Sequence, residues 1–160
     1  MYLSFKPLCP RSADDIHRNI RSEILKTPKV YFTDLGIRNS LLGLTSLSQL
    51  ENLGQFGVIL ENALISRLDA IIIRHRFTAK LHYWRTRTKE EVDIVVYTPE
   101  RLIPIEVKSE KKIAARHLKG LRSFLEKEKE QVGILVGRFA EVDIIEEDNT
   151  RIYIIPYWML

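Results

Sequence analysis

The spacing of apolar residues changes near residue 77, from a helical period to a strand period. Before that point, residues 12–26 keep helical spacing, with Ser12 as an N-cap and Pro28 as a stop. Residues 29–43 predict a short extended piece followed by a turn or brief helix. Residues 48–74 predict one long helix with its glycines near the start.

The second half of the chain alternates between strand and helix patterns. Three consecutive strands are predicted over residues 79–86, 90–98 and 101–109, with turns near Lys89 and Pro99–Glu100. An amphipathic helix is then expected over residues 113–130, with the following side chains turned inward: Ile113, Leu118, Leu121, Phe124 and Leu125. A short buried strand at 131–138 and a last strand with an apolar tail at 150–160 complete the pattern.

This order of elements predicts an α/β fold with a mixed central sheet flanked by helices. Because a helix connects them, residues 131–137 are expected to run parallel to residues 102–108. The predicted division is an N-terminal helical extension over residues 1–48 and a core over residues 49–160.

Three carboxylates stand where apolar residues would be expected. Glu61 interrupts the apolar stripe of the long helix, and Asp93 lies in the apolar run "EEVDIVVYT". Glu106 and Lys108 share one face of the strand "RLIPIEVKS", because alternate side chains of a strand point the same way. A buried carboxylate without a partner costs several kcal/mol, so each of these acids needs a cation or metal nearby.

One interpretation gathers the three acids at a single point. A hairpin of the two strands would set Asp93 near Glu106, and hard oxygen ligands of this kind suit Mg²⁺ or Mn²⁺. Such an ion activates water and neutralises charge on a phosphodiester. Lys108 would orient the attacking water or stabilise the developing charge.

Each residue also has a structural interpretation. Glu106 and Lys108 could form a surface pair on the wet face of a half-buried sheet. Asp93 could be an acid close to a turn on an edge strand, and Glu61 could pair with an arginine such as Arg85. A bond from Arg85 to Glu61 or Asp93 would indicate a site locked without metal.

In this order, the acids resemble the active site of the PD-(D/E)XK nuclease superfamily. That fold, restriction-endonuclease-like, carries an acid on its first core helix, an Asp on the second strand and an (Asp/Glu)-x-Lys on the third. The resemblance implies Glu61, Asp93, Glu106 and Lys108 as catalytic residues, the three acids as metal ligands, and the Val107 carbonyl as a further ligand. The proline of the motif is absent, because Val92 precedes Asp93.

A closer resemblance covers nearly the whole chain. The blocks "KVYFTDLGIRNSLLG", "GVILENALISRL", "LHYWRT", "EVDIVV" and "PIEVKS" are similar, in order, to the landmarks of domain of unknown function 4143. That domain usually forms the C-terminal part of archaeal and bacterial AAA-type ATPases. The resemblance implies an ATPase module as a partner, and the chain is expected to be a truncated product, an excised domain or a free-standing relative.

Composition narrows the function classes. The chain has 160 residues, a net charge of +4 and no apolar run near the roughly 18 residues of a membrane span, so a cytoplasmic location is expected. The single cysteine, Cys9, excludes an internal disulfide, and the four histidines lack the spacing of a zinc motif. No phosphate-binding glycine loop is present, so no ATP site is expected, and an enzyme of small molecules has little support.

Basic side chains flank the proposed site in the sequence and are candidates for sequence-independent phosphate contacts. The alternative is that they are the solvated face of a helix. The candidates for contacting nucleic acid are Arg85, Arg87, Lys111, Lys112, Arg116 and Lys119.

Two hypotheses of function follow. The first is a metal-dependent nuclease-like domain acting on DNA, a phosphodiester hydrolase using Mg²⁺ or Mn²⁺. The second is a catalytically inactive module that binds DNA or regulates an ATPase. For the second, the apolar tail "IIPYWML" would dock on a partner or on another copy in a homo-oligomer.

Overall fold

A computed structural model describes residues 5–8, 10–11, 29–86 and 90–159. The predicted helix over residues 12–26 and the predicted turn near Lys89 lie outside the described residues. The elements in chain order are β1 (Phe5–Leu8), β2 (Pro10–Arg11), β3 (Lys29–Phe32), α1 (Leu35–Leu41), α2 (Leu47–Asn52), α3 (Phe56–His75), β4 (Lys80–Arg85), β5 (Glu91–Tyr97), β6 (Leu102–Lys108), α4 (Ala115–Glu128), β7 (Val132–Gly137), β8 (Asp143–Glu147), β9 (Thr150–Pro156) and a 3₁₀ turn (Tyr157–Met159).

The central sheet is mixed, as the sequence predicts. Among the described residues it has seven strands in the order β2-β4-β5-β6-β7-β9-β8, and β1 pairs with β3 in a separate two-stranded sheet. Strands β4, β5 and β6 form an antiparallel meander. Helix α4 then connects β6 to β7, which is parallel to it, so the predicted parallel crossover is confirmed.

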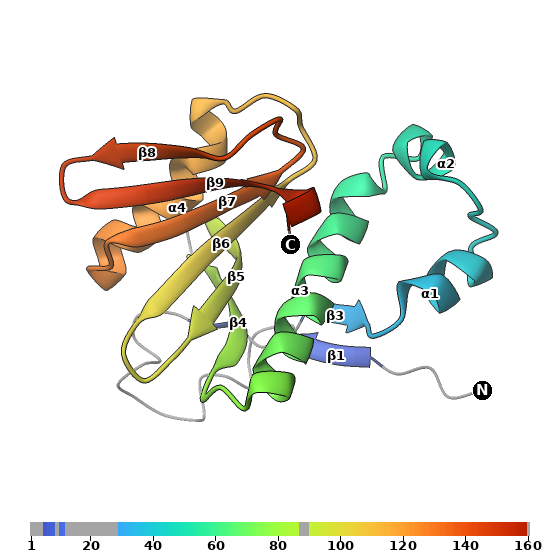
Figure 1. The fold of residues 1–160 in the computed structure, drawn as a ribbon, viewed down its shortest axis with the longest axis horizontal. Helices are drawn as coiled ribbons and strands as arrows, with labels where there is room; N and C mark the ends of the chain where they lie inside the picture. The colour runs from blue at the N-terminus through green and yellow to red at the C-terminus, as the bar shows by residue number, and fades with distance from the viewer. Residues whose placement is uncertain (1–4, 9, 12–28, 87–89, 160) are drawn as a thin grey trace.

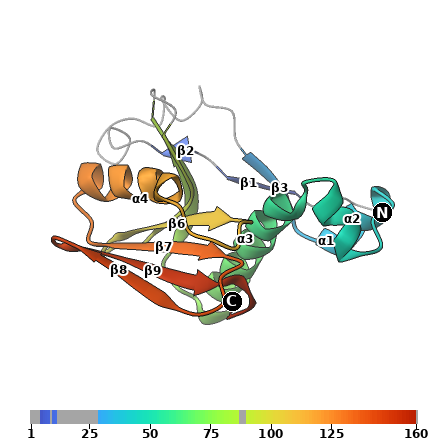
Figure 2. The same ribbon diagram turned by 90° about the horizontal axis from the view of Figure 1, so that it is seen from above.

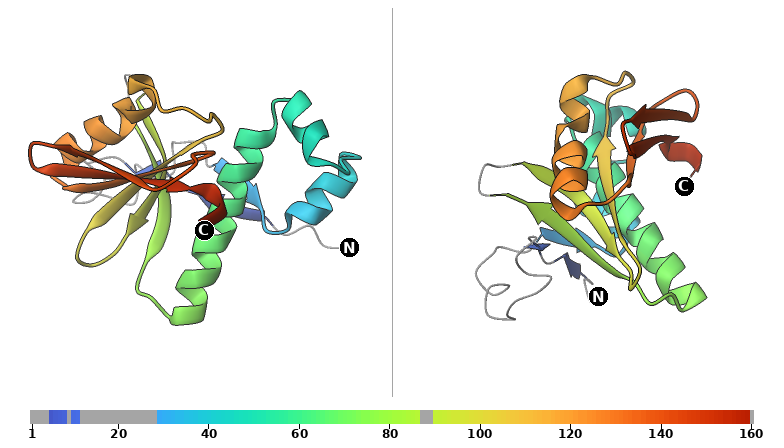
Figure 3. Two further views of the ribbon diagram at one scale, coloured as in Figure 1. Left: turned by 45° about the horizontal axis from the view of Figure 1, so that its top comes forward. Right: turned by 90° about the vertical axis from the view of Figure 1, so that its left-hand side faces the viewer.

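The two long helices cover opposite faces of the sheet (Figures 2 and 3). On the α3 face, Leu60, Leu64 and Ile65 pack with apolar residues of β4, β5 and β6. On the α4 face, the predicted inward residues Leu118, Leu121, Phe124 and Leu125 are buried against β5, β7 and β9. Ile113, also predicted inward, is 37% exposed, because α4 begins only at Ala115.

Helix α4 lies unusually close to the start of β5. A Cβ added at Gly120 would lie only 2.1 Å from the backbone oxygen of Glu91. A glycine therefore allows the helix backbone to approach the start of β5, the strand that carries Asp93.

The predicted long helix over residues 48–74 is in fact two helices. Gly54 has a φ of +64°, which glycine adopts without strain, and it separates α2 from α3. Helices α1 and α2 project from α3 away from the sheet (Figure 1). The described part of the predicted helical extension also contains β1, β2 and β3, so it is not wholly helical.

Strand β8 was missed by the sequence prediction. Its residues have a mixed exposed and half-buried pattern, and it pairs only with β9 at the edge of the sheet. Among the described helices, none has the length and apolar character needed to cross a bilayer.

Candidate functional site

The hairpin of β5 and β6 brings Asp93 next to β6. Their antiparallel register pairs Ile94 with Ile105, and continuing it by one residue sets Asp93 opposite Glu106. The Asp93 carboxylate accepts a hydrogen bond from the backbone N–H of Val107 at 3.0 Å. The predicted proximity of Asp93 and Glu106 is therefore confirmed, and it follows from strand pairing.

A bulge in β5 changes the direction in which the Asp93 side chain points. Between the pairs His82–Val95 and Trp84–Val92, β4 has one residue and β5 has two, Asp93 and Ile94, so β5 carries an extra residue here. Val92 and Val95 consequently both pack on the α4 face, although they are three residues apart. Bulges of this kind are frequent next to functional sites, where they redirect a side chain.

Glu106 forms a buried pair with Lys108. The Lys108 ammonium donates to Glu106 Oε1 at 2.5 Å, and the Glu106 side chain is only 10% exposed. Burial and the nearby Asp93 raise the pKa of Glu106 to about 7, although Lys108 opposes the shift. Burial lowers the pKa of Lys108, but Glu106, Asp93 and Glu110 together outweigh this effect and the net pKa is raised.

The second oxygen of Glu106, Oε2, is buried and has no hydrogen-bond partner among the described residues. A buried carboxylate oxygen without a partner carries a desolvation cost, so this atom is available to a ligand with positive charge. The wet-face interpretation of the pair does not hold, because Glu106 is one of the buried charged residues.

On the α3 face, three acids converge on Lys29 of β3. Its ammonium nitrogen lies 3.2 Å from Glu61 Oε1, 2.6 Å from Glu91 Oε1 and 3.5 Å from Asp93 Oδ1. Burial lowers the pKa of Lys29, but the carboxylates of Glu61, Asp93 and Glu91 outweigh that effect and raise it. Lys29 also lies 5.3 Å from the centre of the Tyr83 ring.

Tyr31 completes this group, since its hydroxyl donates to Glu61 Oε1. Burial and this hydrogen bond raise the pKa of the Tyr31 hydroxyl, so it remains a donor. Burial and the charge of Asp93 raise the pKa of Glu61, against the opposing effects of Lys29 and Tyr31. We name Lys29, Tyr31, Glu61, Glu91 and Asp93 the Lys29 cluster.

Asn62 fixes the position of β3 and therefore of Lys29. Its side-chain oxygen accepts from the backbone N–H of Phe32 at 3.0 Å, and its NH₂ donates to the Phe32 carbonyl at 2.6 Å. Asn62 follows Glu61 on α3 and is 5% exposed. One buried amide thus attaches β3 to the helix that carries Glu61.

Glu61 and Glu106 reach Asp93 from opposite faces of the sheet. Ile105 and Val107 pack on the α3 face, so alternation along β6 puts Glu106 on the α4 face. Glu61 belongs to α3 and is held by Lys29 on the other face. Within residues 29–86 and 90–159, no group of three or more His, Cys, Asp or Glu side chains is placed to hold a metal ion.

The three acids therefore differ in how they fit a divalent ion. Glu106 has an oxygen to offer, because its Oε2 is buried without a partner in the described part of the chain. Asp93 is adjacent, but its Oδ2 accepts from the Val107 N–H and its Oδ1 lies 3.5 Å from Lys29. The carbonyl of Val107 lies between Glu106 and Lys108 on the same strand. Glu61 does not fit in this arrangement, because Lys29 and Tyr31 already occupy its oxygen on the other face.

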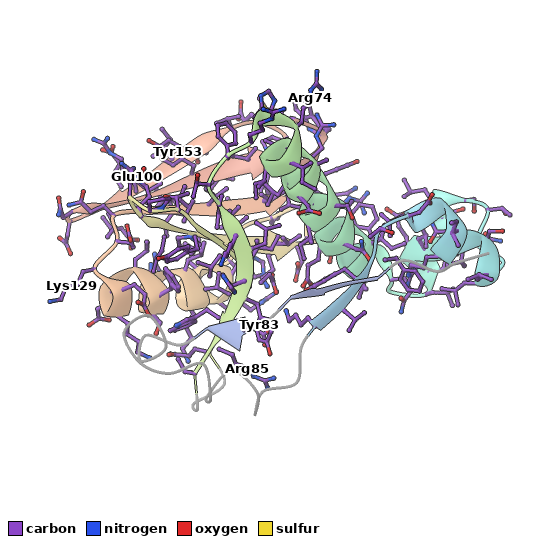
Figure 4. The ribbon with its side chains drawn as sticks, turned by 90° about the horizontal axis from the view of Figure 1, so that it is seen from below. Arg74, Tyr83, Arg85, Glu100, Lys129 and Tyr153 are labelled. Atoms are coloured by element: carbon purple, nitrogen blue, oxygen red, sulfur yellow. The ribbon has the colours of Figure 1, made fainter. Side chains whose placement is uncertain are left out.

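The basic candidates are distributed unevenly. Arg85, which lies with Tyr83 on β4 (Figure 4), is 3.8 Å from Glu91 and pairs with neither Glu61 nor Asp93. Arg116 and Lys119 pair loosely with Glu110 and Glu90. Lys111 and Lys112 are exposed in the loop that follows β6, and Arg87 lies outside the described residues.

Sequence reasoning missed Lys29, Tyr31 and Asn62. A signal for the first two exists in "KVYF", where strand alternation puts Lys29 and Tyr31 on one face, just as it pairs Glu106 with Lys108. Asn62 has no such signal, because a polar residue on a helix next to Glu61 is typical of a solvated surface.

Comparisons with known proteins place these residues within a family. The family described as "Domain of unknown function (DUF4143)" matches residues 56–157, which include Glu61, Asp93, Glu106 and Lys108 but not Lys29. Two relatives are 30% identical over 90 residues, "Uncharacterized protein Mb2031c" of Mycobacterium bovis and "Uncharacterized protein Rv2008c" of Mycobacterium tuberculosis. The match covers 56% of this chain but only 20% of each relative, so the chain spans about a fifth of their length. Since the family match extends over more than half of its residues, the chain belongs to the DUF4143 family.

Proposed function

We propose that residues 49–160 form a PD-(D/E)XK-like domain that hydrolyses DNA phosphodiesters with Mg²⁺ or Mn²⁺. The observation that carries the proposal is Glu106, a carboxylate buried at the end of β6 with one oxygen unpartnered among the described residues. Asp93 on the paired strand and Lys108 two residues on complete an arrangement of two acids and an ammonium.

In this proposal Asp93 and Glu106 hold the ion, with the Val107 carbonyl as a third protein ligand. The bound ion would act as a Lewis acid toward a phosphodiester oxygen and lower the pKa of a bound water. The contribution of Lys108 comes from its ammonium, which is held by Glu106 and directed to the place where negative charge develops.

A DNA substrate is supported by the position of exposed positive charge. Lys111 and Lys112 are exposed in the loop after β6, two residues beyond the end of the strand that carries Glu106 and Lys108. Contacts from such side chains to phosphates are independent of sequence and weaken with salt. A substrate backbone held there would lie next to the proposed ion ligands.

The test is cleavage of supercoiled plasmid and of branched DNA by the whole chain with millimolar Mg²⁺ or Mn²⁺. We expect Asp93→Asn and Glu106→Gln each to lose at least about 100-fold in rate, typical of removing a group that stabilises developing charge. The matched control is Lys127→Met, which removes a lysine that pairs with Glu90 away from the proposed ligands. No cleavage by the parent chain, or equal cleavage by the parent and these variants, contradicts the proposal.

A second candidate function is a nuclease-like module that binds DNA or an ATPase without cutting. The specific observation in its favour is the Lys29 ammonium, which already lies within ion-pair distance of Glu61, Glu91 and Asp93. Retained DNA binding by a chain that binds no Mn²⁺ would support this candidate and exclude the first.

A further inference from the structure

The first turn of α3 lies where three parallel strands end. Strands β6, β7 and β9 are neighbours in the sheet and run in the same direction toward α3 (Figure 2). The residue that follows each strand lies against the start of the helix: Ser109 after β6, Arg138 after β7 and Tyr157 after β9. In open α/β sheets, ligands bind outside the carboxyl ends of the strands, which is the position of this turn.

Phe56 and Gly57 of α3 make these contacts. The Phe56 ring meets the Tyr157 ring edge-on with 5.9 Å between centroids, and the Arg138 guanidinium lies 4.7 Å from the centre of the Phe56 ring. A Cβ placed at Gly57 would lie 3.5 Å from Ser109 Oγ, so the helix backbone faces this hydroxyl with no side chain between them. The backbone of the first turn is therefore close to the end of β6.

The start of α3 has no side chain of its own that satisfies its backbone donors. Gln55, the N-cap residue, forms no side-chain cap, and the first turn contains no acidic residue. The first N–H groups of a helix have no partner within the helix, and the helix dipole adds partial positive charge at this end. Such an end binds an anion when a further positive group lies beside it.

Arg38 of α1 is that group, and it indicates an anionic ligand independently of the helix. It is 8% exposed, and its guanidinium donates to the side-chain oxygens of Asn39 at 3.0 Å and Gln55 at 2.9 Å. Both acceptors are neutral amides, and none of the partners of Arg38 among the described residues is a carboxylate. A guanidinium stays charged and has more N–H donors than these bonds use, and a buried charge normally has a counter-charge. The bond to Gln55 holds this charge beside the first turn of α3.

We propose that Arg38 and the first turn of α3 form a binding site for a phosphate group. The guanidinium and the N–H groups of the turn donate to the phosphate oxygens, and Ser109 Oγ is a further donor at the same place. Lys111 and Lys112, exposed in the loop that Ser109 begins, extend the positive charge as the repeating phosphates of a nucleic-acid strand require. The role toward DNA rests on the proposed function, whereas the phosphate site itself requires neither a divalent ion nor cleavage.

The first test is titration of the whole chain with inorganic phosphate in EDTA, followed by NMR. We expect the backbone amide signals of residues 56–58 and the Nε–H signal of Arg38 to shift along one saturable curve. Arg38→Met should weaken phosphate binding about ten-fold or more, because it removes charge-assisted hydrogen bonds. The matched control is Arg151→Met, which makes the same change at the opposite end of β9, where Arg151 pairs with Glu146, and it should bind phosphate as the parent does.

Gly57→Asp tests the site without changing Arg38, and it covers the case in which Arg38→Met fails to fold. The added Cβ has room beside Ser109, and an acid in the first turn of a helix is favourable for folding. A purely structural role for this turn therefore predicts a stable chain with unchanged phosphate binding. We expect a stable chain that binds phosphate about ten-fold more weakly, because the new carboxylate repels the ligand. Gly57→Asn, of the same size but uncharged, should bind phosphate more tightly than Gly57→Asp.

Two oligonucleotides of one sequence, with a 5′-phosphate or a 5′-hydroxyl, identify the source of the phosphate. Their binding is measured by fluorescence anisotropy in EDTA, so neither an ion nor cleavage contributes. Weaker binding of both by Arg38→Met supports an internal phosphodiester at the site, and weaker binding of the phosphorylated one alone supports a strand end. Unchanged binding of both overturns the assignment to DNA.

The remaining outcomes separate this site from the proposed function. No shift of residues 56–58 with phosphate, or equal phosphate affinity of the parent, Arg38→Met and Gly57→Asp, overturns the phosphate site. Shifts with acetate but not with phosphate also overturn it, because the ligand would then be a carboxylate. None of these results affects cleavage through Asp93 and Glu106. A chain that binds phosphate here but cuts no DNA with Mg²⁺ or Mn²⁺ supports the phosphate site and overturns the proposed function.

Discussion

The carboxylates on the α3 face and the carboxylate on the α4 face, on either side of Asp93, have different partners. On the α3 face, the Lys29 cluster gathers three carboxyl groups around one ammonium and one hydroxyl, with each acid engaged. On the α4 face, Glu106 has one lysine and one buried oxygen without a partner among the described residues. The comparison shows that a cluster of acids does not by itself indicate a metal site. The deciding feature is whether the acids already have partners from the protein.

The largest difference in the free energy of unfolding is expected when Lys29 and Lys108 are each replaced in turn. Lys29→Met should lower the free energy of unfolding by about 3 kcal/mol near pH 7.5 without divalent ions. That is the low end for breaking a buried pair, because Lys29 keeps some exposure. Lys108→Met should cost less, about 1 kcal/mol, because only Glu106 loses its partner and its raised pKa allows it to take up a proton. Urea unfolding of both variants measures the difference, and an equal cost for both would remove the distinction between the two faces.

The next change detaches β3 without touching a charge. Asn62→Ala removes two hydrogen bonds to Phe32, whose carbonyl still accepts from Ser66 Oγ, so we expect a loss of about 2 kcal/mol, roughly 1 kcal/mol for each bond. Because β3 carries Lys29, this variant should also increase hydrogen exchange at Phe32 and reduce the further cost of Lys29→Met. Full additivity of the two costs in a double-mutant cycle would show that Asn62 does not position Lys29.

The sequence predicts the pairing of Asp93 with Glu106 and Lys108, but not the approach of Lys29. The reason is that Lys29 is far from its partners along the chain. Asp93, Glu106 and Lys108 lie on consecutive strands of a meander, so alternation and hairpin pairing are enough to bring them together. Lys29 meets Glu61 and Asp93 only because β3 packs against α3, and the contact spans 32 and 64 residues of sequence. No local pattern encodes that approach. The break at Gly54 was equally hidden, because apolar spacing continues across it while the backbone turns to positive φ.

The two faces should also differ in how they make the free energy of unfolding depend on pH. The pKa of Glu106 is about 7 in the folded chain, against an ordinary value of 4.5. Between these values the folded state keeps a proton that the unfolded chain has released, so the free energy of unfolding falls as pH rises. We expect Glu106 to contribute a loss of about 2 kcal/mol between pH 5 and pH 8. Lys29, whose pKa is raised, stays charged in both states over this range and adds no slope.

Urea unfolding at several pH values measures this contribution as the difference between the parent chain and Glu106→Gln. The variant should lose about 2 kcal/mol of the parent's pH dependence, while any slope from Glu61 remains in both. Saturating Mn²⁺ should also flatten the slope in the parent, because an ion favours the ionised carboxylate. Identical slopes in the parent and the variant would mean that Glu106 is not buried as described.

The smallest expected effect concerns Arg85, the arginine that sequence alone suggested as a partner for Glu61 or Asp93. It is 53% exposed and its Nε lies 3.8 Å from Glu91, a distance and exposure at which ion pairs contribute little. Arg85→Ala should therefore change the free energy of unfolding by less than about 0.5 kcal/mol and leave Mn²⁺ binding unchanged. A loss comparable to that of Lys29→Met would mean that Arg85, rather than Lys29, balances the acids in solution. The cation that partners the acids on the α3 face would then come from β4 rather than from β3.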